Sequence, residues 1–124
     1  MRKTSANIGF IGISGRGSGM LDLLLQVDGV KVPAVCDLIP ERAERGIEIV
    51  EKANNKEYPV HAYLDYKEMF ANEELDAVVI ATTWITHARI AVDAMKAGCH
   101  VATEVGGAAS VEECWQMVRA SEET

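Results

Sequence analysis

Six residues near the N-terminus, Gly12-Ile13-Ser14-Gly15-Arg16-Gly17, have the composition and spacing of a turn that holds an anion. An apolar run from Ile8 to Ile13 precedes the small residues and an apolar-periodic segment from Met20 to Val27 follows them, which predicts a strand, a tight turn and a helix. Because a helix N-terminus offers unpaired N–H groups and a positive dipole end, the expected ligand is a pyrophosphate. The spacing fits the dinucleotide pattern G-x-G-x-x-G at its first and third glycines, with Ser14 in the middle position.

Two other glycine-containing motifs do not fit this turn. A Walker P-loop requires a lysine after its second glycine, whereas Gly17 is followed by Ser18. A nucleophile elbow requires a glycine two residues after its serine, whereas Arg16 occupies that position. One alternative stays open, because a glycine-rich turn can also serve only to pack a helix closely against a strand.

An acidic residue follows the second predicted strand at the spacing that a dinucleotide site requires. Asp37 lies 20 residues beyond Gly17, where a carboxylate accepts hydrogen bonds from the adenosine ribose hydroxyls. A carboxylate there favours NAD over NADP because it repels a 2′-phosphate, although the nearby Arg42 softens that preference. The alternative is that Asp37 is an acid at a helix N-terminus before Pro40, and both roles are compatible.

Polar residues also follow the fourth and fifth predicted strands, and we expect them to line the path to the nicotinamide. The alternatives are that Trp84 is a lid over the sheet, that His87 is a ligand-free residue of a helix first turn, and that Glu104 is a cap. His87 and Glu104 are the two weak catalytic candidates, and no metal site is predicted. The residues expected to line the path to the nicotinamide are Thr82, Thr83, Trp84, His87 and Glu104.

Strands that alternate with helices predict a doubly wound parallel α/β sheet of the Rossmann type, in three layers with strand order 3-2-1-4-5. Pro33 has no N–H to donate, so pairing of the second strand is expected only from Ala34 onward. A capping box opens the last helix, whose predicted buried stripe is Val111, Cys114, Trp115 and Val118. The predicted strands are 7–13, 30–36, 60–62, 77–81 and 100–103, and the predicted helices are 16–27, 40–54, 65–70, 86–98 and from 110 onward.

The composition is that of one globular domain of 124 residues, with a net charge of −7 from 19 acidic and 12 basic residues. This acidic balance, without a basic run, argues against nucleic acid or an anionic membrane as a partner. Cys36, Cys99 and Cys114 are widely spaced, which favours reduced thiols over a metal or disulfide framework. The longest apolar run is too short to cross a membrane, so we expect a soluble cytoplasmic protein.

With these residues assembled, the chain resembles the N-terminal NAD(P)-binding domain of the Gfo/Idh/MocA oxidoreductases. Its loop Gly15-Arg16-Gly17 and its segment Ser110-Val111-Glu112-Glu113-Cys114-Trp115 are most similar to a branch that includes NAD-dependent glycosidases. The residues that carry the resemblance are Gly12 to Gly19, Ala34 to Asp37, Pro40 to Ala43, Asp76 to Thr82, His87, and Ala94 to Gly98 leading to Val101 and Glu104.

The resemblance implies NAD(P)-dependent hydride transfer on a sugar or a related small molecule. In the glycosidase branch it implies transient oxidation of a sugar, elimination of the glycosidic substituent, addition of water and re-reduction. The family's Glu-Lys-Pro after strand five is Glu104-Val105-Gly106 here, so no lysine acid/base is carried over, and the family's proline after strand four is Thr83. Val105 best supports a further alternative, a non-catalytic dinucleotide-binding or regulatory domain, and an S-adenosylmethionine-binding domain is a third.

Family members carry a second, substrate-binding domain, whereas this chain ends at Thr124. Glu122 and Glu123 place acidic side chains at the negative end of the last helix dipole, whereas natural helices tend to carry the opposite charge there. We therefore expect residues 1–124 to be one dinucleotide-binding domain from a longer two-domain protein, inactive by itself. Strand five would then be an open sheet edge, which predicts a homo-oligomer.

Overall fold

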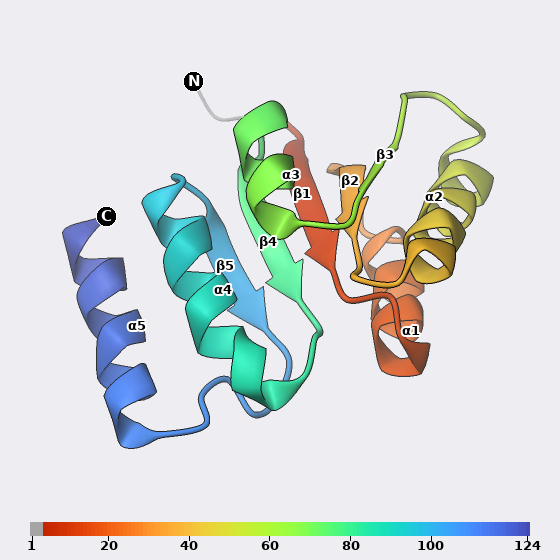
Figure 1. Cartoon of the computed structure of the whole chain (residues 1–124). Helices are drawn as coiled ribbons and strands as arrows, with labels where there is room; N and C mark the ends of the chain where they lie inside the picture. Colours follow the sequence, from red (N-terminus) through yellow and green to blue (C-terminus); the bar gives the residue numbers. More distant parts are fainter. Residues whose placement is uncertain (1–3) are drawn as a thin grey trace.

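The computed structural model describes residues 4–124 and places five strands in one parallel sheet, in the order β3-β2-β1-β4-β5 (Figure 1). Helices connect the strands one after another, so the predicted doubly wound topology is confirmed. The elements are β1 (Ala6–Ile11), α1 (Gly15–Leu24), β2 (Val30–Cys36), α2 (Pro40–Asn54), β3 (His61–Tyr63), α3 (Tyr66–Asn72), β4 (Ala77–Ile80), α4 (Trp84–Lys96), β5 (His100–Thr103) and α5 (Val111–Glu123).

The two faces of the sheet carry two separate apolar clusters. Successive side chains of a strand point to opposite faces, so Phe10 joins one cluster and its neighbour Ile11 joins the other. The Phe10 face is covered by α1 and α2 through side chains such as Leu21 and Val50. The Ile11 face is covered by α3 and α4 through side chains such as Met69. A sheet buried on both faces explains why the central strand β4 is apolar throughout.

The second strand has the predicted bounds, but the expectation that its pairing starts only at Ala34 is wrong. Val30 and Lys31 already pair with β1, and the register then shifts opposite Ile8 before pairing resumes at Ala34. Pro33 lies in this shifted stretch. A proline lacks an N–H, and a bulge is one of the few places where a sheet tolerates it.

The start of α5 agrees with the predicted capping box. The hydroxyl of Ser110 accepts the N–H of Glu113 at 3.2 Å, and the carboxylate of Glu113 accepts the N–H of Ala109 at 2.7 Å. The predicted buried stripe, however, is wrong. Val111, Trp115 and Val118 are 74%, 54% and 45% exposed, and Cys114 is exposed too.

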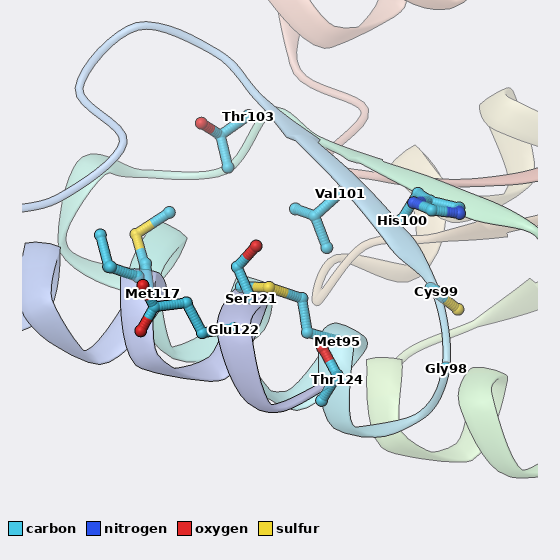
Figure 2. A pocket seen from close by; sticks show the side chains of 11 residues that line it. Met95, Gly98, Cys99, His100, Val101, Thr103, Met117, Ser121, Glu122 and Thr124 are labelled. Carbon is cyan, nitrogen blue, oxygen red and sulfur yellow. The ribbon is translucent and has the colours of Figure 1, made fainter.

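The stripe is exposed because α5 packs mainly against α4, beyond the last strand of the sheet (Figure 1). A hollow of about 700 Å³ separates α5 from β5, and Met95, Val101 and Met117 line it together with polar groups such as Ser121 (Figure 2). These residues share one face of the helix, as the helical period predicts, but among the described residues no strand lies outside β5 for this face to cover.

Candidate functional site

The glycine turn brings the start of α1 close to the carboxyl end of β1. Gly12 has a φ of +102°, and a Cβ there would lie 2.5 Å from the carbonyl oxygen of Ala81. A Cβ on Gly17 would lie 1.9 Å from the carbonyl oxygen of Gly12, so both positions require glycine. In contrast, a Cβ on Gly15 would meet no atom within 4 Å. The start of α1 therefore faces open space, as an anion cradle must.

Ser14 is the N-cap of α1, yet its side chain makes no capping hydrogen bond. The first N–H groups of any helix lack partners within the helix, and here they belong to Gly15, Arg16 and Gly17. The hydroxyl of Ser14 and these amides are thus placed to meet a ligand together. The residues fit a diphosphate, because the turn is tight, free of bulky side chains and located at the positive end of a helix dipole.

Asp37 ties the glycine turn to the start of α2. Its Oδ2 accepts the N–H of Ile13 at 2.8 Å, and its Oδ1 accepts the N–H of Ile39 at 2.9 Å. Ile39 is the N-cap of α2, so Asp37 does serve a helix N-terminus, as the alternative interpretation supposed. Each carboxylate oxygen can accept more than one hydrogen bond, so this fixed carboxylate can still bind a hydroxyl group.

A hollow of about 350 Å³ lies at the carboxyl ends of β1, β2, β3 and β4. Five predicted site residues line it, namely Gly12, Ser14, Asp37, Thr82 and Thr83. The hollow beside α5 is larger, but none of the predicted site residues lines it. Ligands of open α/β sheets bind beyond the carboxyl ends of the strands, so we assign the chemistry to the smaller hollow.

The wall of this hollow is largely apolar, which the sequence analysis missed. Leu38 is 85% exposed, Ile39 41% and Leu64 49%, although all three are large apolar residues. Tyr66 and Arg89 also line the hollow. Their position in the sequence indicates this role, because Leu38 and Leu64 follow the carboxyl ends of β2 and β3, where ligands of such sheets bind.

The turn between β4 and α4 places Thr82 and Thr83 in the wall of the hollow, whereas Trp84 does not line it. The hydroxyl groups of Thr82 and Thr86 share a hydrogen bond of 2.7 Å. The hydroxyl of Thr86 lies 2.8 Å from the carbonyl oxygen of Thr83, to which it donates. Trp84 begins α4, two residues earlier than predicted, and is 65% exposed. Its indole lies against Gly106, where a Cβ would come within 2.7 Å of the ring.

His87 is fully buried and does not line the hollow. Its Nδ1 lies 2.9 Å from the carbonyl oxygen of Gly106, and its Nε2 lies 2.9 Å from that of Thr82. Both partners are carbonyl oxygens, so the ring nitrogen that carries the proton donates to one of these two loops. In this conformation the imidazole joins the loops after β4 and β5, which places it as a positioning residue.

Glu104 and Arg16 form an ion pair, with Arg16 Nη2 3.5 Å from Glu104 Oε2. Arg16 belongs to the first turn of α1, and Glu104 directly follows β5. Because β4 lies between β1 and β5 in the sheet, the pair spans the carboxyl end of β4. Neither Arg16 nor Glu104 lines the hollow.

Cys36 lines the hollow but is not a nucleophile. Burial, with smaller contributions from the charges of Asp37 and Asp65, raises the pKa of its thiol to about 12. The thiolate is the reactive form, and it is scarce at neutral pH.

Within residues 4–124, no group of three or more His, Cys, Asp or Glu side chains is arranged to hold a metal ion. No helix in this range is both long and apolar enough to span a bilayer.

Comparison with known proteins decides the family. The family model for the NAD-binding Rossmann fold of the Gfo/Idh/MocA oxidoreductase family matches residues 6–124. The chain belongs to this oxidoreductase family. The predicted resemblance to this family is therefore confirmed.

Several curated relatives are glycosyl hydrolase family 109 proteins. One from Solibacter usitatus is 36% identical over 124 residues, which cover 97% of this chain and 28% of the relative. Another from Bacteroides fragilis is 38% identical over 119 residues, which cover 94% of this chain and 26% of the relative. The chain thus spans about a quarter of the length of these relatives, and they match the glycosidase branch that the sequence indicated.

Solved structures share the fold. The WlbA dehydrogenase from Bordetella pertussis, in complex with NADH and UDP-GlcNAcA, has a TM-score of 0.82 and 25% identity, and the match covers 96% of this chain and 35% of that one. The scyllo-inositol dehydrogenase from Lactobacillus casei has a TM-score of 0.87 at 18% identity, covering 99% of this chain and 35% of that one. This second likeness supports the fold alone.

Proposed function

We propose that this chain is the NAD-binding part of an oxidoreductase that acts by hydride transfer on a sugar or a related small molecule. The arrangement around Asp37 carries the proposal. Its carboxylate is fixed between the glycine turn and α2 and borders a hollow lined by Gly12, Ser14 and Thr82. Family membership supports the same conclusion.

The cofactor is proposed to bind along the carboxyl edge of the sheet. Ser14, Gly15, Arg16 and Gly17 bind the diphosphate at the start of α1, and Gly12 permits its close approach. Asp37 accepts the hydroxyl groups of the adenosine ribose. The exposed apolar wall of the hollow suits the flat face of an adenine.

The nicotinamide is proposed to lie toward the loops after β4 and β5. Thr82, Thr83, Trp84 and Glu104 border this end, and His87 holds the two loops together from beneath. Bound NAD supplies a hydride acceptor there. The side chains orient it, and Glu104 provides the one carboxylate among these residues for holding or moving a proton.

NAD is proposed as the cofactor in preference to NADP. The fixed carboxylate of Asp37 would repel a 2′-phosphate on the ribose that it binds. Arg42 lines the same hollow and reduces this discrimination without reversing it.

The relatives favour a second candidate within the same chemistry, an NAD-dependent glycosidase. Glycosyl hydrolase family 109 proteins match 94–97% of this chain at 36–38% identity. A glycosidase of this kind returns its hydride to the sugar, so product forms without net NADH, whereas a dehydrogenase accumulates NADH. A non-catalytic dinucleotide-binding domain is the third candidate, favoured by Val105, which is 76% exposed and cannot titrate. The S-adenosylmethionine alternative is set aside by the family match.

We propose that the substrate of the whole protein is a sugar-like small molecule. Residues 1–124 are proposed to form a single dinucleotide-binding domain. Copies of the chain are proposed to associate through the outer edge of β5, because among the described residues β5 pairs with β4 alone and α5 exposes an apolar stripe beside it. The three free thiols support a reducing, cytoplasmic location.

Titration of NADH fluorescence tests the proposal. The full chain should bind NADH, and Asp37→Ala should weaken binding about tenfold or more, since it removes a charged hydrogen-bond acceptor from the ribose site. Asp76→Ala is the matched control. Asp76 also accepts a backbone N–H, that of Asn7 at 2.8 Å, but at the opposite end of the sheet. Absence of NADH binding by the unaltered chain would remove the cofactor proposal and leave the fold.

A further inference from the structure

The ion pair between Arg16 and Glu104 is placed where the proposed cofactor must pass. It joins the first turn of α1 to the residue after β5, across the end of β4. The proposed diphosphate site lies at one end of this contact and the proposed nicotinamide site at the other. One carboxylate therefore holds the arginine of the anion cradle when no cofactor is bound.

The two partners are held very differently. The side chain of Glu104 is 23% exposed, and its backbone N–H donates to the carbonyl of Ile80 at 2.9 Å, so the residue is anchored to β4. The side chain of Arg16 is 68% exposed. A long, exposed arginine side chain changes rotamer easily, so the arginine is the partner that can move.

The charges favour an exchange of partners. The guanidinium of this pair is largely exposed, and an ion pair with a solvated partner contributes little to stability. A diphosphate carries more negative charge than one carboxylate, and it would sit at the positive end of the α1 dipole, beside the backbone of Arg16. The guanidinium also matches phosphate oxygens with two parallel hydrogen bonds. The diphosphate is thus the stronger ligand for Arg16.

We propose that Arg16 alternates between two partners: it pairs with Glu104 in the free chain and with the cofactor diphosphate in the bound chain. Glu104 is then an internal competitor for the arginine, and cofactor binding releases its carboxylate at the nicotinamide end. This inference rests on the proposed function, because it requires a diphosphate at the start of α1. Glu104 thus holds Arg16 before the cofactor binds, and its carboxylate is free at the nicotinamide end afterwards.

The test measures ADP binding to the full chain by calorimetry. ADP carries the diphosphate but has no nicotinamide, so it reports the competition without any contact between Glu104 and the ring. Glu104→Gln should tighten ADP binding about three- to fivefold, the upper range for an exposed ion pair. Adenosine, which has no diphosphate, should bind both forms equally.

Two further variants separate partner exchange from a general charge effect. Arg16→Gln should weaken ADP binding, and adding Glu104→Gln to it should then change nothing. The matched control is Glu112→Gln, which also removes one carboxylate from an exposed ion pair, with Arg119 at 3.7 Å on α5, and should leave ADP binding unchanged. An unchanged or weakened affinity in Glu104→Gln would overturn the inference, as would an effect that persists without Arg16.

The failure of the proposed function looks different. If the unaltered chain binds neither NADH nor ADP, both proposals fall. If it binds both nucleotides and Asp37→Ala weakens NADH binding, but Glu104→Gln does not tighten ADP binding, only the partner exchange is wrong.

Discussion

At the scale of single residues, two side chains of the candidate site form hydrogen bonds with the protein backbone. Asp37 joins the glycine turn to α2, and His87 joins the loops after β4 and β5. Their hydrogen-bond partners are backbone groups, so these side chains fix the shape of the turns that carry the site. Substitution of either residue therefore changes loop geometry as well as ligand contacts.

Tyr66 gives a testable pH dependence at this scale. Its hydroxyl donates to Asp93 at 2.6 Å, and burial followed by this hydrogen bond raises the pKa of the phenol to about 12, against 10 for an ordinary tyrosine. The folded state thus binds the proton more tightly than the unfolded chain. This contribution to stability is fully present below pH 10 and is lost as the pH rises toward 12.

We expect Tyr66→Phe to be less stable than the unaltered chain by about 1.5–3 kcal/mol at pH 8, the range for a hydrogen bond to a charged group. The difference should shrink between pH 10 and 12, because the unaltered chain then loses the same hydrogen bond. Urea unfolding at pH 8 and pH 11.5 measures both values. A gap that stays constant over this range would contradict the assigned cause.

At the scale of elements, the connection from β1 to α1 decides whether an anion can approach. Its glycines divide into two kinds, those that the protein itself needs and those that leave space open. Gly12 and Gly17 face backbone atoms at 2.5 and 1.9 Å, whereas Gly15 and Gly19 face no atom within 4 Å. The close packing of the turn therefore depends on Gly12 and Gly17, whereas Gly15 and Gly19 leave the space around the start of α1 open.

Alanine substitutions at Gly17 and Gly19 should have opposite effects on stability. Gly17→Ala forces a methyl group onto the Gly12 carbonyl, so we expect a loss of about 1–3 kcal/mol and weaker NADH binding. Gly19→Ala lies in an exposed part of α1 and should stabilise by about 0.5–1 kcal/mol. Thermal or urea unfolding of the two variants measures this contrast, and a tolerated Gly17→Ala would show that α1 can move away from β1.

At the scale of the whole molecule, β5 forms an open edge of the sheet, because among the described residues it pairs with β4 alone. The N–H groups of His100 and Glu104 donate to β4, so by alternation those of Val101 and Thr103 point outward. The hollow between this edge and α5 is lined by apolar and polar groups of both elements (Figure 2). An edge of this kind pairs readily with another chain.

We expect the chain to self-associate, with a mean mass that rises with concentration in sedimentation velocity. Thr103→Pro removes an outward N–H without breaking the pairing of β5 with β4, so it should shift the chain toward monomer. Thr103→Val retains that N–H and should associate as before. A clean monomer of the unaltered chain at high concentration would refute association through this edge.

The sequence by itself determined the topology and the type of site. Alternating strand and helix patterns lead to one sheet order because crossovers are right-handed, and the spacing from Gly12 to Asp37 is a local property of one strand-helix-strand unit. Five of the predicted residues accordingly line the hollow. These features depend on short stretches of chain, which the sequence displays directly.

Only the tertiary structure decided which side chains meet and which surfaces are covered. The burial of His87 between two carbonyl groups, the contact of Arg16 with Glu104, and the apolar wall of Leu38 and Leu64 all join segments that are distant in sequence. The exposed face of α5 has the same cause. A helical period shows which residues share a face, but only the neighbouring elements determine whether that face is buried.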